Sequence, residues 1–155
     1  MKVALYSRVS TGHQNVQQQL DMLKKYAKSQ EWEIIHVVKD QESGKIPLLE
    51  RKKFKALLDN LEPYDAVLVY KLDRLTRNWA DEPALERAFS NGCTLFSMDG
   101  AIDLKSADGR VMFRMRMAMA CWEPELMRER QKVGIARARA DGKFKGGKKG
   151  RTWAK

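Results

Sequence analysis

The feature that most constrains the fold is an alternation of short apolar runs with longer amphipathic segments in the first hundred residues. The apolar runs predict buried strands over 2–7, 32–39, 65–71 and 93–98. The amphipathic segments predict helices over 14–30, 50–61 and 79–91, and the pair Asn91-Gly92 predicts a left-handed cap for the last. Strands that alternate with helices favour an α/β fold with a mostly parallel central sheet flanked by helices. The segment 40–49, with glycine, proline and mixed charge, predicts a mobile loop.

A second constraint is a long C-terminal helix, predicted over 108–140. Gly142 ends the predicted helix. Before it, apolar residues recur at spacings of three and four: Val111, Met115, Ala118, Met119, Trp122 and Leu126. About 33 residues at ~1.5 Å per residue make a rod of roughly 50 Å. The first hundred residues should have a radius of gyration of only ~13 Å. We therefore expect the rod to extend past the globule and to self-associate through its methionine-rich face. Alternatively, Met112 to Met119 packs on its own domain.

The positive charge is concentrated at the C-terminus. The net charge is +10, and residues 128–155 hold eleven Lys or Arg against two acidic residues, so they carry almost all of it. A near-neutral body with a basic tail is typical of a protein that binds a polyanion, above all nucleic acid. A merely solvated tail is the alternative. We expect the DNA contacts from Arg137, Arg139, Lys143, Lys145, Lys148 and Lys149.

Neither a membrane span nor a metal site is predicted. The apolar runs are too short to cross a bilayer, and the start MKVALYSR lacks the apolar stretch of a signal peptide, so we expect a cytoplasmic protein. The chain has two cysteines, Cys93 and Cys121, and two histidines, His13 and His36. Their spacing does not match that of zinc ligands, so we expect the cysteines to be ordinary thiols.

Polar residues stand at the end of the first predicted strand. Tyr6, Arg8 and Ser10 should project from one side of it, and Ser7 and Val9 from the other. Ser10 would then lie at the carboxyl edge of the sheet, where ligands bind in open α/β folds, with Gln14 in the first turn of the next helix. A hydroxyl at such a place is also a common helix N-cap, so this segment alone does not identify a nucleophile.

A second polar cluster, YKLDRLTRN (70–78), follows the third predicted strand and so belongs to the same edge. If this stretch is helical, Arg74 and Arg77 share one face. Together with Arg8, and with Arg51 from the loop, they could surround one phosphate with bidentate donors and stabilise charge that develops on it. Because no set of carboxylates or histidines suits Mg²⁺ or Zn²⁺, we expect catalysis without a metal or cofactor. Asp73 either carries a proton or holds an arginine.

Four motifs in order resemble those of the serine recombinases, the family of resolvases, invertases and large integrases. They cover almost the whole chain: YSRVSTGHQ with Gln19, DQESG with Arg51, YKLDRLTRN, and ELMRERQKVGIARARADGKFKGG. The resemblance implies a resolvase-like fold and site-specific recombination of double-stranded DNA by dimers and tetramers. It implies that Ser10 attacks a phosphodiester, giving a 5′-phosphoserine link and a free 3′-hydroxyl, without a nucleotide cofactor.

The resemblance also implies roles for individual residues. Arg8, Arg74 and Arg77 match the family's phosphate-binding arginines, and Asp73 its aspartate. Supporting positions are Gln14, Arg51, Ser43, Gln19, Tyr6, Glu129 and Arg130. Pro124 stands where the family usually has arginine, and it predicts a bend or break of the helix near 120–123.

The resemblance divides the chain into a catalytic core (1–105), a dimerisation and DNA-crossing helix (106–141) and a basic hinge or tail (142–155). We expect no separate DNA-reading domain in this sequence, which ends in GGKKGRTWAK. Two other functions compete: a non-catalytic DNA-binding or regulatory module with the same fold, and, less favoured, a recombinase whose nucleophile is Tyr6.

Overall fold

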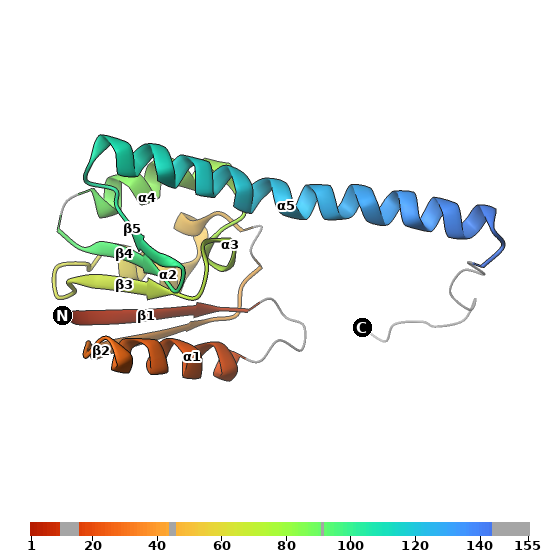
Figure 1. Ribbon diagram of the computed structural model, residues 1–155. Helices are drawn as coiled ribbons and strands as arrows, with labels where there is room; N and C mark the ends of the chain where they lie inside the picture. The colour runs from red at the N-terminus through yellow and green to blue at the C-terminus, as the bar shows by residue number, and fades with distance from the viewer. Residues whose placement is uncertain (10–15, 44–45, 91, 144–155) are drawn as a thin grey trace. The chain divides into compact units, whose positions relative to one another are not determined.

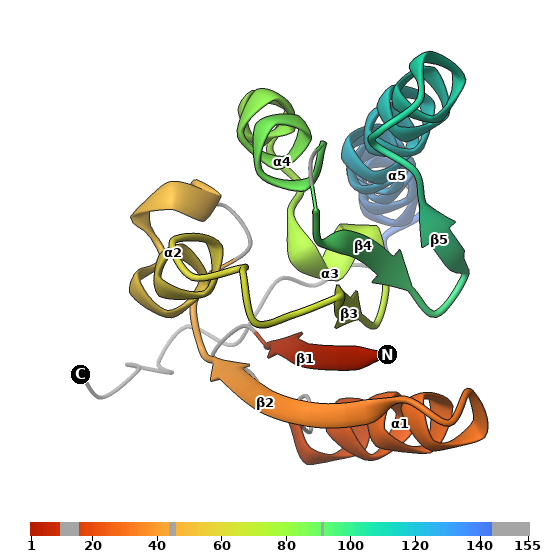
Figure 2. The same cartoon turned by 90° about the vertical axis from the view of Figure 1, so that its left-hand side faces the viewer.

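The computed structural model describes residues 1–9, 16–43, 46–90 and 92–143. Its centre is a five-stranded sheet (Figure 2). In spatial order the strands are β2 (Glu33–Asp40), β1 (Lys2–Arg8), β3 (Ala66–Val69), β4 (Thr94–Ser97) and β5 (Gly100–Ile102). The first four are parallel, and β5 pairs antiparallel with β4. The predicted α/β class with a mostly parallel sheet is therefore confirmed.

Helices cover both faces of the sheet. The α-helices are α1 (Val16–Ser29), α2 (Lys52–Leu58), α3 (Leu72–Leu75), α4 (Glu82–Phe89) and α5 (Ala107–Ala140), with short 3₁₀ helices η1 (Leu48–Glu50) and η2 (Trp79–Asp81). Helix α1 lies on one face, and α2, α4 and the first part of α5 lie on the other (Figures 1 and 2). No helix among these residues is long and apolar enough to cross a membrane.

Side-chain alternation along the strands builds a core on each face. In β1, Val3 and Leu5 pack with Leu20 and Leu23 of α1. Ala4 and Tyr6 point to the other face, where residues of α2, α3, α4 and α5 join them. Cys93 belongs to this second core as a free thiol, and its burial raises the pKa of the thiol to about 11.

Four predictions of local structure need correction. Strand β5 was not predicted, because three residues are too few to show a period of two. The third strand ends at Val69, and the predicted helix over 79–91 begins as the 3₁₀ helix η2. Fourth, the predicted range of the loop, 40–49, is too long at both ends. Asp40 is the last residue of β2, Leu48 is the first residue of η1, and both are buried.

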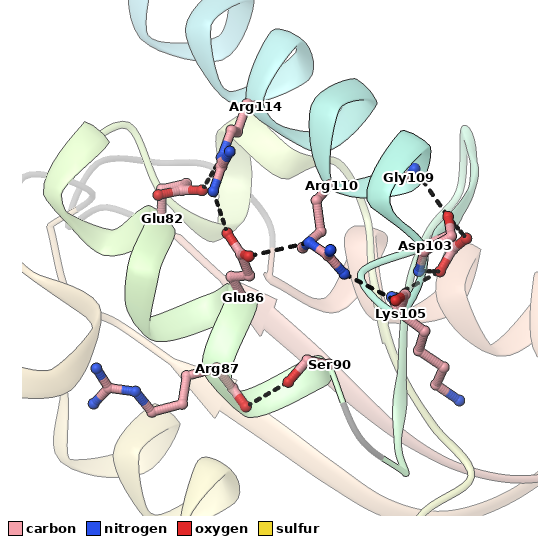
Figure 3. A network of polar contacts seen from close by, with 10 residues as sticks. Glu82, Glu86, Arg87, Ser90, Asp103, Lys105, Gly109, Arg110 and Arg114 are labelled. Carbon is pink, nitrogen blue, oxygen red and sulfur yellow. Dashed lines mark hydrogen bonds and ion pairs between the residues drawn. The ribbon is translucent and has the colours of Figure 1, made fainter.

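Helix α5 confirms the predicted long C-terminal helix. Its start is fixed by side-chain caps: the Asp103 carboxylate accepts from the amides of Lys105 and Ser106, and the Ser106 hydroxyl accepts from the amide of Gly109 (Figure 3). The helix is continuous through residue 124, so the predicted break is wrong, while the alternative of a bend near 120–123 stays a prediction. A proline removes one backbone hydrogen bond, and the other bonds of a long helix can offset that loss.

The core-facing side of α5 differs from the face that the spacing suggested. Phe113, Met117 and Ala120 are buried. The exposed large apolar residues of this helix are Val111, Met112, Met115, Met119, Trp122, Met127, Val133 and Ile135. Of the methionines between 112 and 119, therefore, only Met117 packs on its own domain. The chain forms two compact units, 1–121 and 122–155.

Charged side chains join the first turns of α5 to α4. Arg114 donates to Glu82 and to Glu86, each at 2.8 Å, and Arg110 lies 3.3 Å from Glu86 (Figure 3). Arg110 also donates to the backbone oxygen of Lys105 at 2.8 Å. The hydrogen bonds that Arg114 donates to Glu82 and Glu86 raise the pKa of Arg114.

Candidate active site

The polar residues predicted from the sequence come from neighbouring strand ends. Strands β2, β1 and β3 are adjacent and parallel, so their carboxyl ends meet at one edge of the sheet (Figure 1). Strand β1 ends at Arg8 and β2 at Asp40, while α3 follows β3 after two residues and carries Asp73 and Arg74. This edge is where open α/β sheets bind ligands.

Arg8 is buried at this edge and is held by main-chain oxygens. Its Nε donates to the carbonyl of Arg74 at 2.8 Å, and one terminal nitrogen donates to the carbonyl of Glu42 at 2.9 Å. Both acceptors are neutral, so they orient the guanidinium without cancelling its charge. Burial lowers the pKa of Arg8, and the charges of Arg51, Arg77 and Arg74 lower it further. Arg8 therefore feels the positive charge of the other three arginines, and the four are called the arginine cluster below.

Arg51 is buried more deeply than expected for a residue that binds a phosphate directly. Its side chain is fully buried: Nε and one terminal nitrogen donate to the carbonyl of Ile46 at 2.9 and 2.7 Å, and the other donates to the carbonyl of Leu75 at 2.5 Å. Arg51 thus joins the segment before η1 to the end of α3. In this structure it supports the cluster from below, whereas the sequence suggested direct contact with phosphate.

Tyr6 and Asp40 form a buried pair beneath the arginines. The Tyr6 hydroxyl donates to a carboxylate oxygen of Asp40 at 2.7 Å. Burial raises the pKa of Tyr6 far above its usual value, as does the Asp40 carboxylate, while Arg51 opposes the shift. Tyr6 is therefore a protonated hydrogen-bond donor at neutral pH. Sequence reasoning did not identify Asp40, because an acidic residue at a strand end gives no signal of its partner.

Asp73 lies between the two outer arginines. Its carboxylate is 3.4 Å from a terminal nitrogen of Arg77 and 3.8 Å from Nε of Arg74, and its carbonyl accepts from Nε of Arg77 at 3.2 Å. Helix α3 ends at Leu75, so Arg74 and Arg77 do not share a helix face as the sequence suggested. Both guanidinium side chains are about one-third exposed, at 30% and 38%, and can reach a ligand.

The remaining predicted site residues are distributed as follows. Ser7 donates to Gln19 of α1 at 3.2 Å, Ser43 is exposed, and Glu129 and Arg130 are exposed on α5. Arg137, Arg139 and Lys143 are also exposed, and Lys143 lies 3.3 Å from Asp141. Several predicted residues lie outside the described ones: Ser10, Gln14, Lys145, Lys148 and Lys149. Within the described ranges, no three His, Cys, Asp or Glu side chains gather as a metal site requires.

Comparison with known proteins shows the family of this chain. The sequence model of a family described as "Resolvase, N terminal domain" matches residues 3–144. The Tn2501 resolvase of Escherichia coli is 35% identical over 144 residues, which cover 92% of this chain and 73% of the relative. The DNA-invertase Hin of Salmonella typhimurium is 36% identical over 142 residues, covering 91% and 70%.

Solved structures point the same way. The N-terminal catalytic domain of TP901-1 integrase superposes with a TM-score of 0.63 at 36% identity, covering 81% of this chain and 98% of that one. A resolvase family site-specific recombinase from Streptococcus pneumoniae gives a TM-score of 0.58 at 28% identity, covering 90% and 99%. The family match spans nearly the whole chain, and both structural matches cover most of it. This chain therefore belongs to the resolvase family of site-specific recombinases and corresponds to its N-terminal domain.

Proposed function

We propose that this chain is the catalytic domain of a serine-type site-specific DNA recombinase, with Ser10 as its nucleophile. The observation that carries the proposal is geometric: Arg8 at the end of β1 donates to the backbone of Arg74 at 2.8 Å, and the side chains of Arg74 and Arg77 are about one-third exposed at the same sheet edge. Such a cluster attracts a DNA phosphate, and the segment that follows β1 in sequence supplies the hydroxyl. Val9, the residue before Ser10, is buried and donates its amide to the carbonyl of Asp40 at 3.1 Å.

The proposed reaction is a transesterification. The Ser10 hydroxyl loses its proton as its oxygen forms a bond to phosphorus. The bond from phosphorus to the 3′ oxygen breaks, and that oxygen takes up a proton and leaves as a 3′-hydroxyl, so the step consumes and releases one proton. The 5′ end stays attached to Ser10 as a phosphodiester, which conserves the energy needed for religation. The reverse attack by a 3′-hydroxyl from a partner strand restores the DNA and frees Ser10.

The arginines divide between contact and support. Arg74 and Arg77 are exposed enough to bind the phosphate oxygens, on which charge develops during the attack. Arg51 and Tyr6 are buried and hydrogen-bond to other residues of the domain, so their proposed role is to support the site from inside the protein. Asp73 faces two guanidinium groups at 3.4 and 3.8 Å, and this geometry favours the holding role over that of a proton carrier.

We further propose that double-stranded DNA is the partner and that the protein acts as dimers that pair into tetramers. The exposed apolar residues of the first part of α5, including Met112, Met115 and Met119, supply a surface suited to self-association. Arg137, Arg139 and Lys143, with Lys145, Lys148 and Lys149 of the tail, would bind DNA phosphates without reading sequence. This assigns 1–105 to the catalytic core, 106–141 to the assembly helix and 142–155 to a basic hinge or tail.

A recombination assay tests the proposal. The protein is incubated with a plasmid carrying two copies of its native site, and recombined product is quantified. Ser10→Ala should reduce the product by at least about 10³-fold, because the nucleophile is lost. Ser7→Ala, which removes a hydroxyl bonded only within the domain to Gln19, should recombine within a few-fold of the wild type. DNA binding by the wild type without any strand cutting at that site would instead favour the non-catalytic module.

A further inference from the structure

A buried carboxylate outside the arginine cluster ties two of its segments together. Asp81, at the end of η2, is 4% exposed. One of its carboxylate oxygens accepts from the amide of Leu48 at 3.0 Å, and the other accepts from the hydroxyl of Thr76. The Thr76 oxygen in turn accepts from the amide of Asn78 at 3.0 Å. Thr76 and Leu48 are completely buried, so these bonds form away from water.

The two segments joined by Asp81 are those that carry the arginines. Leu48 opens η1, three residues before Arg51, and Thr76 stands between Arg74 and Arg77 in the sequence. Arg51 links the same segments from its side through the carbonyls of Ile46 and Leu75. Two buried polar links, one anionic and one cationic, therefore hold segment 46–51 against segment 74–77.

The position of segment 74–77 affects more than its own side chains. Arg8 is oriented by the carbonyl of Arg74, at 2.8 Å. A shift of this backbone therefore moves Arg8, Arg74 and Arg77 together. Asp81 itself is anchored through the next residue, because Glu82 binds Arg114 of α5 at 2.8 Å (Figure 3).

We propose that Asp81 is a positioning residue for strand cleavage: through Leu48 and Thr76 it sets where Arg74 and Arg77 stand relative to Arg8. This inference rests on the proposed role of the arginines in binding the phosphate. An ionised carboxylate accepts both hydrogen bonds and makes them stronger than neutral acceptors would. An asparagine has one acceptor oxygen: with that oxygen on the Leu48 amide, its NH₂ group would face the Thr76 hydroxyl, which could then only accept, so the Thr76 proton would lose its acceptor and both links would lose the carboxylate charge.

Four variants of the full-length protein test this role by single-turnover cleavage of a nicked substrate that carries the native site. Asp81→Asn and Thr76→Val should lower the cleavage rate at saturating protein about 10- to 100-fold, because small displacements of catalytic groups cost that much. DNA affinity should stay within about twofold. Thr76→Ser keeps the hydroxyl and should cleave near the wild-type rate. Asp59→Asn, which alters an exposed carboxylate of the same domain, should have no effect.

A double-mutant comparison separates positioning from general destabilisation. If Asp81 acts through Arg77, then Asp81→Asn should slow cleavage much less in an Arg77→Lys background than in the wild type. If Asp81→Asn fails to fold, Thr76→Val, which leaves the carboxylate bonded to Leu48, decides the question. Wild-type cleavage rates in folded Asp81→Asn and Thr76→Val would overturn this inference and leave the proposed function intact. Cleavage that survives Ser10→Ala would overturn the proposed function itself.

Discussion

At the scale of single residues, the site depends on charges kept in place by neutral groups. Arg8 and Arg51 are both buried, and both donate to backbone carbonyls. Burial is the main cause of the lowered pKa of Arg8, and the like charges of Arg51, Arg77 and Arg74 lower it further, so keeping this guanidinium charged inside the protein opposes folding. A phosphate between Arg8, Arg74 and Arg77 would relieve this repulsion. The cluster is therefore less favourable alone than with a bound anion, as a phosphate-binding site should be.

Replacing Tyr6 tests the pair beneath the cluster. Tyr6→Phe removes the donor to Asp40, whose buried carboxylate then loses a hydrogen bond, and should lower the free energy of unfolding by about 1–3 kcal/mol in urea titrations. The covalent reaction with DNA should persist, because the protonated Tyr6 is not the nucleophile.

The pH dependence of stability adds a check on Tyr6. Its folded pKa lies above its unfolded value of about 10.0, so its contribution is complete below pH 10 and decreases as the pH rises beyond. Tyr6→Phe should reduce that alkaline loss. A folded Tyr6→Phe protein that no longer attaches to DNA would contradict this assignment.

The arginines and the supporting positions Tyr6 and Arg51 were named from the sequence, whereas the buried carboxylates Asp40 and Asp81 were not. Arg8, Arg74 and Arg77 follow predicted strands, and parallel strands bring their carboxyl ends together, so position along the chain was enough. Asp40 and Asp81 depend on partners 34 and 33 residues away. Nothing in the local sequence distinguishes such an acid from a solvated one. The burial of Arg51 was missed for the same reason.

At the scale of elements, the strands were the easiest to predict and α5 the most instructive. Buried strands appear in the sequence as short apolar runs, so β1 to β4 could be predicted from it. The three-residue β5 and the four-residue α3 are too short for periodicity and are set by tertiary contacts. In α5, several long apolar residues stay exposed while Phe113, Met117 and Ala120 face the core. Spacing alone could not distinguish a core face from a surface available to a partner.

Two glycines of α5 provide a matched prediction. A Cβ at Gly109 would lie 2.3 Å from the Asp103 carbonyl oxygen, whereas one at Gly134 would meet nothing within 4 Å. Alanine favours a helix over glycine by about 1 kcal/mol. Gly134→Ala should therefore increase helicity measured by circular dichroism. Gly109→Ala should instead destabilise the domain by about 1–3 kcal/mol, because the clash disturbs the cap at Asp103. Equal effects on the thermal midpoint would contradict the assigned helix start.

At the scale of the whole molecule, charge and apolar exposure are both concentrated toward the C-terminus. Residues 128–155 hold nearly all of the net charge, and among the residues that the structure describes α5 presents most of the exposed large apolar side chains. In the proposed function, this region would serve both association with a second copy and attraction of DNA, while the arginine cluster lies in the α/β unit. This division of roles stays a prediction from charge and helical spacing.

Salt dependence measures the contribution of the tail. Lys145, Lys148 and Lys149 changed together to Gln should weaken DNA binding and reduce the slope of log affinity against log salt by up to about 3, near 0.9 for each lost phosphate contact. Fluorescence anisotropy between about 50 and 200 mM salt measures this slope. The matched control changes Lys24, Lys25 and Lys28, exposed on α1, to Gln. Equal loss of slope in both triple variants would mean that DNA contacts are not concentrated in the tail.

The central claim is that Ser10 becomes covalently joined to DNA. A suicide substrate carrying the native site, with a nick that lets the short cleaved strand diffuse away, traps the intermediate, and peptide mass spectrometry then locates the attached nucleotide. We expect it on Ser10 with wild-type protein and with Ser7→Ala, and no adduct with Ser10→Ala although that variant still binds DNA. An adduct on Tyr6, or none from active wild-type protein on its native site, would contradict the account.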